Sequence, residues 1–133
     1  KIRIISGEYN GTKGAFEGKY VKATYFDVAL EANKEWSFET NPEDTLFIYM
    51  FYGQATFNPS NQDEIYDAKQ AILFGKGEKF WIKAHETDTR FILLTAKPLG
   101  EPIAWGGPIV MNTKEELDLA FEELRNGTFI KHR

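Results

Sequence analysis

The chain has 133 residues, of which 42% are hydrophobic and 15% aromatic, and its formal net charge is -4. This length predicts one domain with a single core. The acidic residues are spread along the chain, which argues against a site for the nucleic-acid backbone. Without cysteine, disulfides and thiolate metal sites are excluded. No segment resembles a membrane span or a signal peptide, so we expect a cytoplasmic protein.

The first two thirds of the chain predict short strands without helices between them. Strands are expected at residues 1–6, 20–30, 36–38, 45–52, 54–57, 71–74, 79–85 and 90–96. Residues 7–18 contain four glycines and are expected to form an irregular loop. Short strands at this spacing indicate an all-β sandwich or barrel.

The predicted strand 45–52 is apolar on both of its faces. A strand of this kind is usually covered on both sides. We therefore expect it either in the middle of a sandwich or against a partner.

The Pro/Gly loop, residues 97–112, is rigid and unusually apolar. Pro98, Pro102 and Pro108 each restrict one backbone torsion, so the segment adopts one shape at low entropic cost. The loop has more apolar side chains than are usually left in water. These side chains are Leu99, Ile103, Trp105, Ile109, Val110 and Met111. We expect the loop to pack on its own barrel or on a partner.

A helix is predicted over residues 114–126. Thr113 and Glu116 have the spacing of a capping box, and Asn126 with Gly127 indicates a left-handed stop. One apolar stripe has helical spacing and consists of Leu117, Ala120, Phe121 and Leu124. The stripe is expected either to close the domain or to form part of a docking face.

The loop and helix carry a long and specific resemblance. Its motifs are residues 98–103 (PLGEPI), 107–113 (GPIVMNT), 115–116 (EE) and 125–129 (RNGTF). Together they resemble the C-terminal signature of the pirin family. Looser similarity upstream involves residues 7–11, 13–14, 25–28, 49–53 and 75–78, so the resemblance covers nearly the whole chain. Two positions depart from the family pattern, because Ile109 stands where phenylalanine is usual and Gly106 where a larger residue is expected.

The resemblance implies a cupin fold. Pirins are bicupins, with an iron site of three histidines and a glutamate in the N-terminal barrel, and this chain corresponds to the C-terminal barrel. We therefore expect an all-β cupin jelly-roll with one C-terminal helix, as a single domain over residues 1–133. Its strands would occupy residues 1–96, followed by the loop and the helix. The family's quercetin 2,3-dioxygenase-type activity and its iron, or another divalent metal, are expected in the N-terminal cupin.

The residues themselves indicate no catalytic or metal centre, and neither a catalytic residue nor a cofactor is expected in this chain. A histidine and carboxylate site needs about three converging protein ligands. His85 is a weak candidate with Glu86 and Asp88, but neighbouring strand residues point to opposite faces, and His132 is expected in the tail. No serine lies in a nucleophile elbow. Glu101 is expected to be a partly buried carboxylate that anchors the loop through its amides.

Three functions stay open from the sequence. The first is a metal-free interaction module that docks on an N-terminal cupin, in the same or a separate chain, or forms a homodimer, without contact to nucleic acid or membrane. Its docking or structural residues are expected to be Pro98, Leu99, Glu101, Pro102, Trp105, Pro108, Met111 and Asn112, with Thr113 and Glu116 as the helix cap. The second is part of a quercetin 2,3-dioxygenase-like iron enzyme. The third is a small-molecule-binding barrel.

Overall fold

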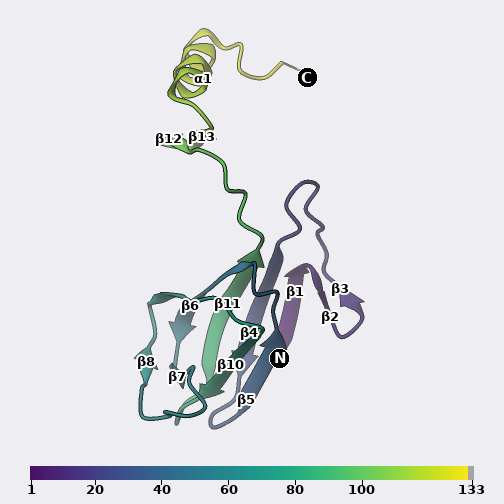
Figure 1. Cartoon of the computed structure of the whole chain (residues 1–133), viewed down its shortest axis with the longest axis vertical. Helices are drawn as coiled ribbons and strands as arrows, with labels where there is room; N and C mark the ends of the chain where they lie inside the picture. The colour runs from purple at the N-terminus through teal and green to yellow at the C-terminus, as the bar shows by residue number, and fades with distance from the viewer. Residues whose placement is uncertain (132–133) are drawn as a thin grey trace. The chain divides into compact units, whose positions relative to one another are not determined.

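The computed structural model describes residues 1–131, which fall into two compact units, Lys1–Pro98 and a second unit that begins at Leu99. The first unit contains two antiparallel sheets packed face to face (Figure 1). The five-stranded sheet consists, in spatial order, of β1 (Ile2–Ser6), β4 (Thr24–Leu30), β11 (Thr89–Ala96), β6 (Thr45–Tyr52) and β9 (Ala71–Leu73). The second sheet consists of β5 (Glu35–Glu39), β10 (Lys79–Ala84), β7 (Gln54–Thr56) and β8 (Tyr66–Asp67). This arrangement confirms the predicted jelly-roll class.

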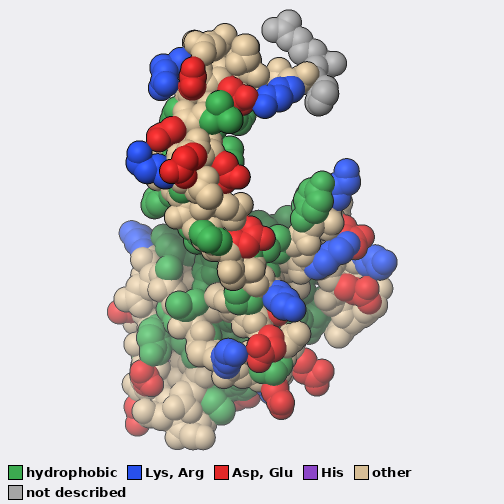
Figure 2. All heavy atoms as spheres, turned by 45° about the horizontal axis from the view of Figure 1, so that its top comes forward, with side chains coloured by type: hydrophobic (Ala, Val, Ile, Leu, Met, Phe, Trp, Pro, Cys, Tyr) green, Lys and Arg blue, Asp and Glu red, His purple; other side chains and the backbone are tan. Residues whose placement is uncertain are grey.

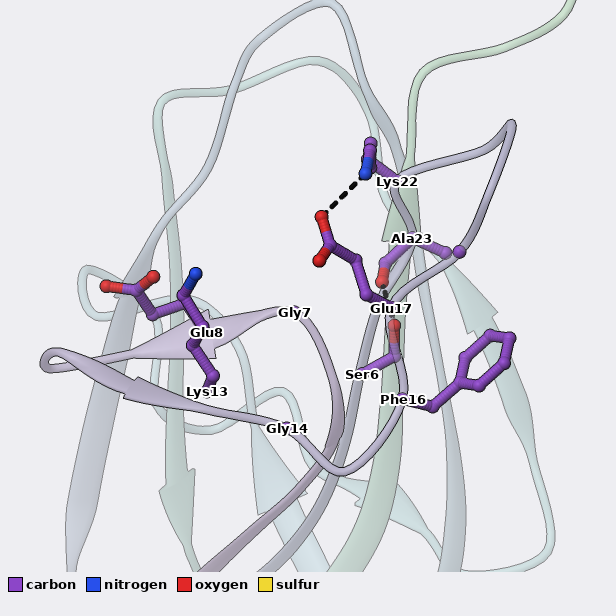
Figure 3. Close-up of a pocket in the computed structure, with 10 residues that line it drawn as sticks. Ser6, Gly7, Glu8, Lys13, Gly14, Phe16, Glu17, Lys22 and Ala23 are labelled. Atoms are coloured by element: carbon purple, nitrogen blue, oxygen red, sulfur yellow. Dashed lines mark hydrogen bonds and ion pairs between the residues drawn. The ribbon is translucent and has the colours of Figure 1, made fainter.

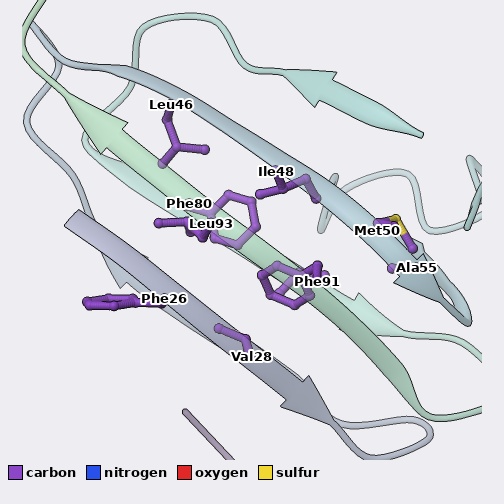
Figure 4. Packing of buried hydrophobic residues seen from close by; sticks show 10 residues of the cluster. Phe26, Val28, Leu46, Ile48, Met50, Ala55, Phe80, Phe91 and Leu93 are labelled. Atoms are coloured by element: carbon purple, nitrogen blue, oxygen red, sulfur yellow. The ribbon is translucent and has the colours of Figure 1, made fainter. Parts of the chain in front are cut away.

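Aromatic and branched side chains fill the space between the sheets. Phe26 of β4 and Phe91 of β11 are fully buried (Figure 4). Across the interior, Phe91 contacts Phe80 of β10 with ring centroids 6.1 Å apart, and Phe26 contacts Phe38 of β5 at 5.3 Å. Trp36 and Phe38 of β5 stack on one another, with ring centroids 6.0 Å apart. The indole N–H of Trp36 donates a 2.9 Å hydrogen bond to the hydroxyl of Tyr9, so the one polar group of that ring is satisfied inside the core.

Most strand predictions are confirmed to within one or two residues, but β8 was not predicted, and two predicted segments differ. The strand expected at 20–30 begins only at Thr24, and Tyr20 lies in a loop with 92% of its surface exposed. The loop expected at 7–18 contains a small hairpin of β2 (Glu8–Tyr9) and β3 (Thr12–Lys13). Its turn residues Asn10 and Gly11 both have positive φ, which is the usual geometry of an Asn-Gly hairpin turn.

The second unit combines a hairpin with the predicted helix. The hairpin, β12 (Ala104–Gly106) with β13 (Ile109–Met111), lies within the segment predicted to be only loop, so that prediction is wrong for these residues. Helix α1 (Lys114–Asn126) is confirmed together with its Thr113 and Glu116 capping box and its left-handed Gly127 cap, φ 70°. The single domain expected over residues 1–133 stays a prediction.

Asp27 links three strands of the five-stranded sheet. Its carboxylate accepts two hydrogen bonds from Arg90 of β11, at 2.8 and 2.7 Å, and one from Arg3 of β1, at 3.0 Å. Only 12% of the Asp27 side chain is exposed. The hydrogen bonds from Arg90, and to a smaller extent the one from Arg3, lower the pKa of Asp27 to about 2 against the opposing effect of burial.

We expect the Asp27 ion pair to make stability depend on acid pH. A carboxyl whose pKa is lower in the folded than in the unfolded chain stabilises the fold above its unfolded pKa of 3.8, and this contribution is lost as the pH falls through about 2. Asp27→Asn should therefore lower the free energy of unfolding by about 2 kcal/mol at neutral pH. Urea unfolding of both proteins at several pH values measures this, and a stability difference that did not shrink between pH 4 and pH 2 would contradict it.

Gly53 is a glycine whose replacement should damage the fold, because both its backbone conformation and its surroundings exclude a side chain. It joins β6 to β7 with φ +85°, and a Cβ there would lie 2.6 Å from the Thr89 hydroxyl and collide with the Asp88 carbonyl. Gly53→Ala should lower the free energy of unfolding by at least about 2 kcal/mol. Gly11→Ala is the matched control, since Gly11 has φ +76° but no neighbour within 4 Å. We expect Gly11→Ala to lower the free energy of unfolding, measured by urea unfolding, by only about 1 kcal/mol.

Candidate functional site

The five-stranded sheet has one side buried against the second sheet and one side turned outward, which we call the outer face. Residues alternate between the two sides along each strand. The outward positions are Arg3, Ile5, Tyr25, Asp27, Ala29, Thr45, Phe47, Tyr49, Phe51, Tyr52, Ala71, Leu73, Arg90, Ile92, Leu94 and Ala96. None of them is fully buried, and most are apolar or aromatic.

The apolar side chains of the outer face form rows across the strands. Leu94 in the central strand pairs with Tyr25 on one side and Phe47 on the other, and Phe47 pairs in turn with Leu73. Phe47 is 38% exposed and Leu73 is 71% exposed. Cross-strand neighbours of this kind are in contact, so the exposed apolar surface is continuous. A contiguous apolar patch on a folded protein typically marks an interaction site.

For strand 45–52 this finding bears on one of the two expected arrangements, because the described residues do not place the strand in the middle of a sandwich. Leu46, Ile48 and Met50 are buried in the sandwich, whereas Phe47 and Phe51 on the other side are exposed. The strand is apolar on both faces, as the sequence indicates, but within the described residues only one face is covered. Its coverage by a partner stays a prediction.

The ion-paired group of Arg3, Asp27 and Arg90, which we call the arginine cluster, lies at one end of the outer face. A register shift in β6 places Tyr52 opposite Arg90, and the guanidinium carbon of Arg90 lies 5.6 Å from the centre of the Phe51 ring. Arg3, Asp27, Tyr52 and Arg90 line a shallow hollow of about 140 Å³. Sequence analysis missed this cluster. Its one local signal is Asp27, a carboxylate inside an otherwise aromatic and branched strand.

The second unit packs its hairpin against one side of the helix. Gly106 faces the helix so closely that an added Cβ would lie 2.9 Å from the Phe121 ring and 3.3 Å from Leu117. Ile109 is buried, and Ala120 is the buried residue of the helix. The two departures from the family pattern thus lie together under the helix, where a residue without a side chain lets the aromatic ring of Phe121 approach the strand. Leu124, expected in the apolar stripe, is exposed.

The other side of this hairpin is an apolar surface without a covering partner in the described residues. Trp105 pairs with Val110 across the hairpin, and both point away from the helix. Trp105 is 75% exposed, and Leu99 and Ile103 in the segment before the hairpin are also exposed. The indole N–H donates to the carbonyl of Gly107 at 2.8 Å, which holds the ring in place without burying it. On the face shown in Figure 2, hydrophobic side chains reach the surface of both units between charged ones.

Glu101 differs from its expected role in one respect. It is exposed, and its carboxylate accepts a 2.9 Å hydrogen bond from the side-chain amide of Asn112 instead of from loop backbone amides. Asn112 also donates to the carbonyl of Pro102. Residues before and after the hairpin are thus tied together, so Glu101 and Asn112 act structurally within this unit. Met111 is half-buried, and Pro98, Pro102 and Pro108 are exposed.

The side chains of this chain do not fit the iron site that the resemblance implies for the other barrel. The interior between the sheets is filled by the aromatic cluster, and within residues 1–131 no three His, Asp or Glu side chains converge. His85 lies just after β10, half-buried, and no hydrogen-bond partner is found for its Nδ1 among the described residues. Asp88, its proposed co-ligand, accepts instead from the backbone N–H of Ala32 at 3.0 Å. His132 lies outside the described residues.

A hollow of about 210 Å³ lies between the β2–β3 hairpin and the loop that precedes β4 (Figure 3). The ion pair of Lys22 with Glu17, at 2.6 Å, crosses one side of it, and the Phe16 ring points away from Glu8 and Lys13. Ser6 in its wall donates to the Ala23 carbonyl at 2.7 Å. Its hydroxyl therefore has a structural partner in the backbone.

Within the described residues, no helix has both the length and the apolar character required to cross a membrane.

Comparison with known proteins gives a consistent result. Residues 25–130 match the model of the pirin C-terminal cupin domain. The chain is 33% identical over 129 residues to a pirin-like protein of Caulobacter vibrioides, covering 96% of this chain and 45% of that protein. It is 28% identical over 126 residues to human pirin, covering 94% and 43%.

Solved structures agree with the sequence relatives. A quercetin 2,3-dioxygenase from Acinetobacter baumannii superposes with a TM-score of 0.85 at 33% identity, over 96% of this chain and 43% of that one. The chain thus spans less than half the length of each of these three proteins. By the family model, the sequence identity and the shared fold, this chain belongs to the pirin family and corresponds to its C-terminal cupin domain.

Proposed function

We propose that this chain is an interaction module that docks on the N-terminal cupin half of a pirin-type protein. The observation that carries the proposal is the outer face, a continuous apolar sheet surface on a unit whose core is already complete. The hairpin of the second unit adds its own exposed apolar surface around Trp105. Burial of apolar area drives protein association, and a flat sheet face of this kind suits a partner of similar shape.

The identity of the partner rests on the lengths of the relatives. Each of the three matched proteins is more than twice as long as the matched region, and the matching family model is that of a C-terminal domain. The remaining part of such a protein is therefore the natural occupant of the outer face. A second copy of this chain is the alternative occupant.

Co-expression with the unmatched N-terminal half of the Caulobacter pirin-like protein tests this proposal. We expect a one-to-one complex in sedimentation equilibrium. Phe47→Ser should weaken it about tenfold or more, because a half-exposed aromatic ring at the centre of the apolar surface is lost. Tyr20→Ser is the matched control, since Tyr20 is an exposed aromatic residue of a loop outside the sheets, and it should have no effect.

Trp105→Ala provides the corresponding test for the second unit. Because Trp105 is 75% exposed, its loss should leave the melting temperature of the isolated chain unchanged while weakening the complex. Global unfolding of the variant would instead place Trp105 in the core of the domain. A chain that stays monomeric at all concentrations and binds no N-terminal half contradicts the proposal, and a homodimer would replace it by the alternative occupant.

A dioxygenase is the second candidate function, because a solved structure with a TM-score of 0.85 is named as a quercetin 2,3-dioxygenase. We place that chemistry outside this chain, since the aromatic interior offers no converging ligand set in the described residues. The purified chain should contain no stoichiometric iron and should not turn over quercetin. Metal analysis with a turnover assay measures both, and activity of the chain alone would favour the enzyme.

The third candidate, a small-molecule-binding barrel, has little support. The aromatic side chains occupy the interior, and the hollow beside Ser6 lies outside the sandwich. Displacement of a fluorescent lipid by candidate ligands would revive this candidate.

A further inference from the structure

The outer face is distinctive in charge as well as in apolarity. The whole chain has a net charge of -4. Of the outward residues in the five described strands, Asp27 is the one acid, and it faces two arginines. The face therefore has a net charge of +1 on a protein that is negative overall.

The two guanidinium groups have more donors than Asp27 can satisfy. Arg90 binds the carboxylate through Nε and Nη2, and Arg3 binds it through Nη1. An arginine has five N–H donors, so Arg90 Nη1 and the remaining nitrogens of Arg3 are directed elsewhere. Among the described residues, no other side-chain acceptor is found for them. Both arginines line the hollow of about 140 Å³, together with Asp27, Tyr52, Ala29 and a further cation, Lys1.

Docking of an apolar partner onto this face would remove water from those donors. A charged donor that loses water without gaining an acceptor costs considerable free energy. A partner that covers the outer face is therefore expected to supply an acceptor at this end, and a carboxylate is the group that binds a guanidinium most strongly.

We propose that the arginine cluster binds a carboxylate of the docking partner, which inserts beside Tyr52 and sets the register of the complex. This inference rests on the proposed docking function and specifies its chemistry, namely an apolar surface bearing an Asp or Glu side chain. A second copy laid face to face does not meet this need, because among the described outward residues its one carboxylate, Asp27, is already bound by two arginines. The charge pattern therefore favours a different chain as partner over a homodimer.

A small apolar acid tests the cluster without any partner. We use 4-phenylbutyrate as the probe and 4-phenylbutan-1-ol as its neutral control, and follow the guanidinium Nε–H signals of Arg3 and Arg90 by NMR. The acid should shift both signals saturably, with a dissociation constant on the order of millimolar, and the alcohol should not. Absence of a saturable shift with the acid would overturn the inference.

Two substitutions in the cluster should act in opposite directions. Arg3→Gln removes one exposed cation and should weaken binding of the acid about tenfold. Asp27→Asn removes the internal competitor and raises the charge of the face to +2, so binding should become tighter. Lys79→Gln on β10 is the control that changes net charge equally on the other sheet, and it should have no effect. If Lys79→Gln weakened binding as much as Arg3→Gln, the cause would be a general charge effect and the inference would be overturned.

The same variants in the complex with the Caulobacter N-terminal half separate the two proposals. Arg3→Gln should weaken that complex and reduce its dependence on salt, while Lys79→Gln leaves both unchanged. If the complex forms and Arg3→Gln changes neither its affinity nor its salt dependence, the carboxylate inference fails and the docking function stands. If the cluster binds the acid but no complex forms, the docking function fails instead.

Discussion

Aromatic packing between the two sheets is the interaction on which the rest of this structure depends. Phe80 and Phe91 lie in contact across the sandwich, Trp36 of β5 contacts both rings, and Phe26 packs on Phe38. Each ring of this size contributes a few kcal/mol when buried, so together they hold the sheets face to face. The same rings occupy the interior of the jelly-roll. A domain that uses its interior for packing has to present its function on its surface.

The outer face follows from this constraint. Strand alternation requires that if Ile48 and Met50 point inward, Phe47 and Tyr49 point outward. Apolar residues at both sets of positions give β6 one side for the core and, in the proposed complex, one side for the partner. Apolar contact alone does not fix the orientation of a partner. The arginine cluster at the end of this face does so in the proposed complex, because its donors need an acceptor at one position. In the proposed complex, apolar area supplies affinity and the cluster supplies orientation.

The second unit shows the same division between an internal and an external side. Gly106 and Ile109 face the helix, while Trp105 and Val110 face away from it. The hydrogen bonds of Asn112 to Glu101 and Pro102 tie the residues around the hairpin together, so its outward side chains are held in one arrangement. Such preorganisation lowers the entropy cost of binding.

The sequence by itself determined the features that depend on neighbours in the chain. The helix from Lys114 with its cap, the alternating strands and the family motifs are all local patterns, and each is present in the structure. The Asn10-Gly11 hairpin was also recoverable, because its turn signal is local. Two features were decided only by the tertiary structure. These are which face of β6 is exposed and the ion pairs of Asp27 with Arg3 and Arg90. Those partners are 24 and 63 residues away, and their meeting depends on strand order and register, which no short-range pattern specifies.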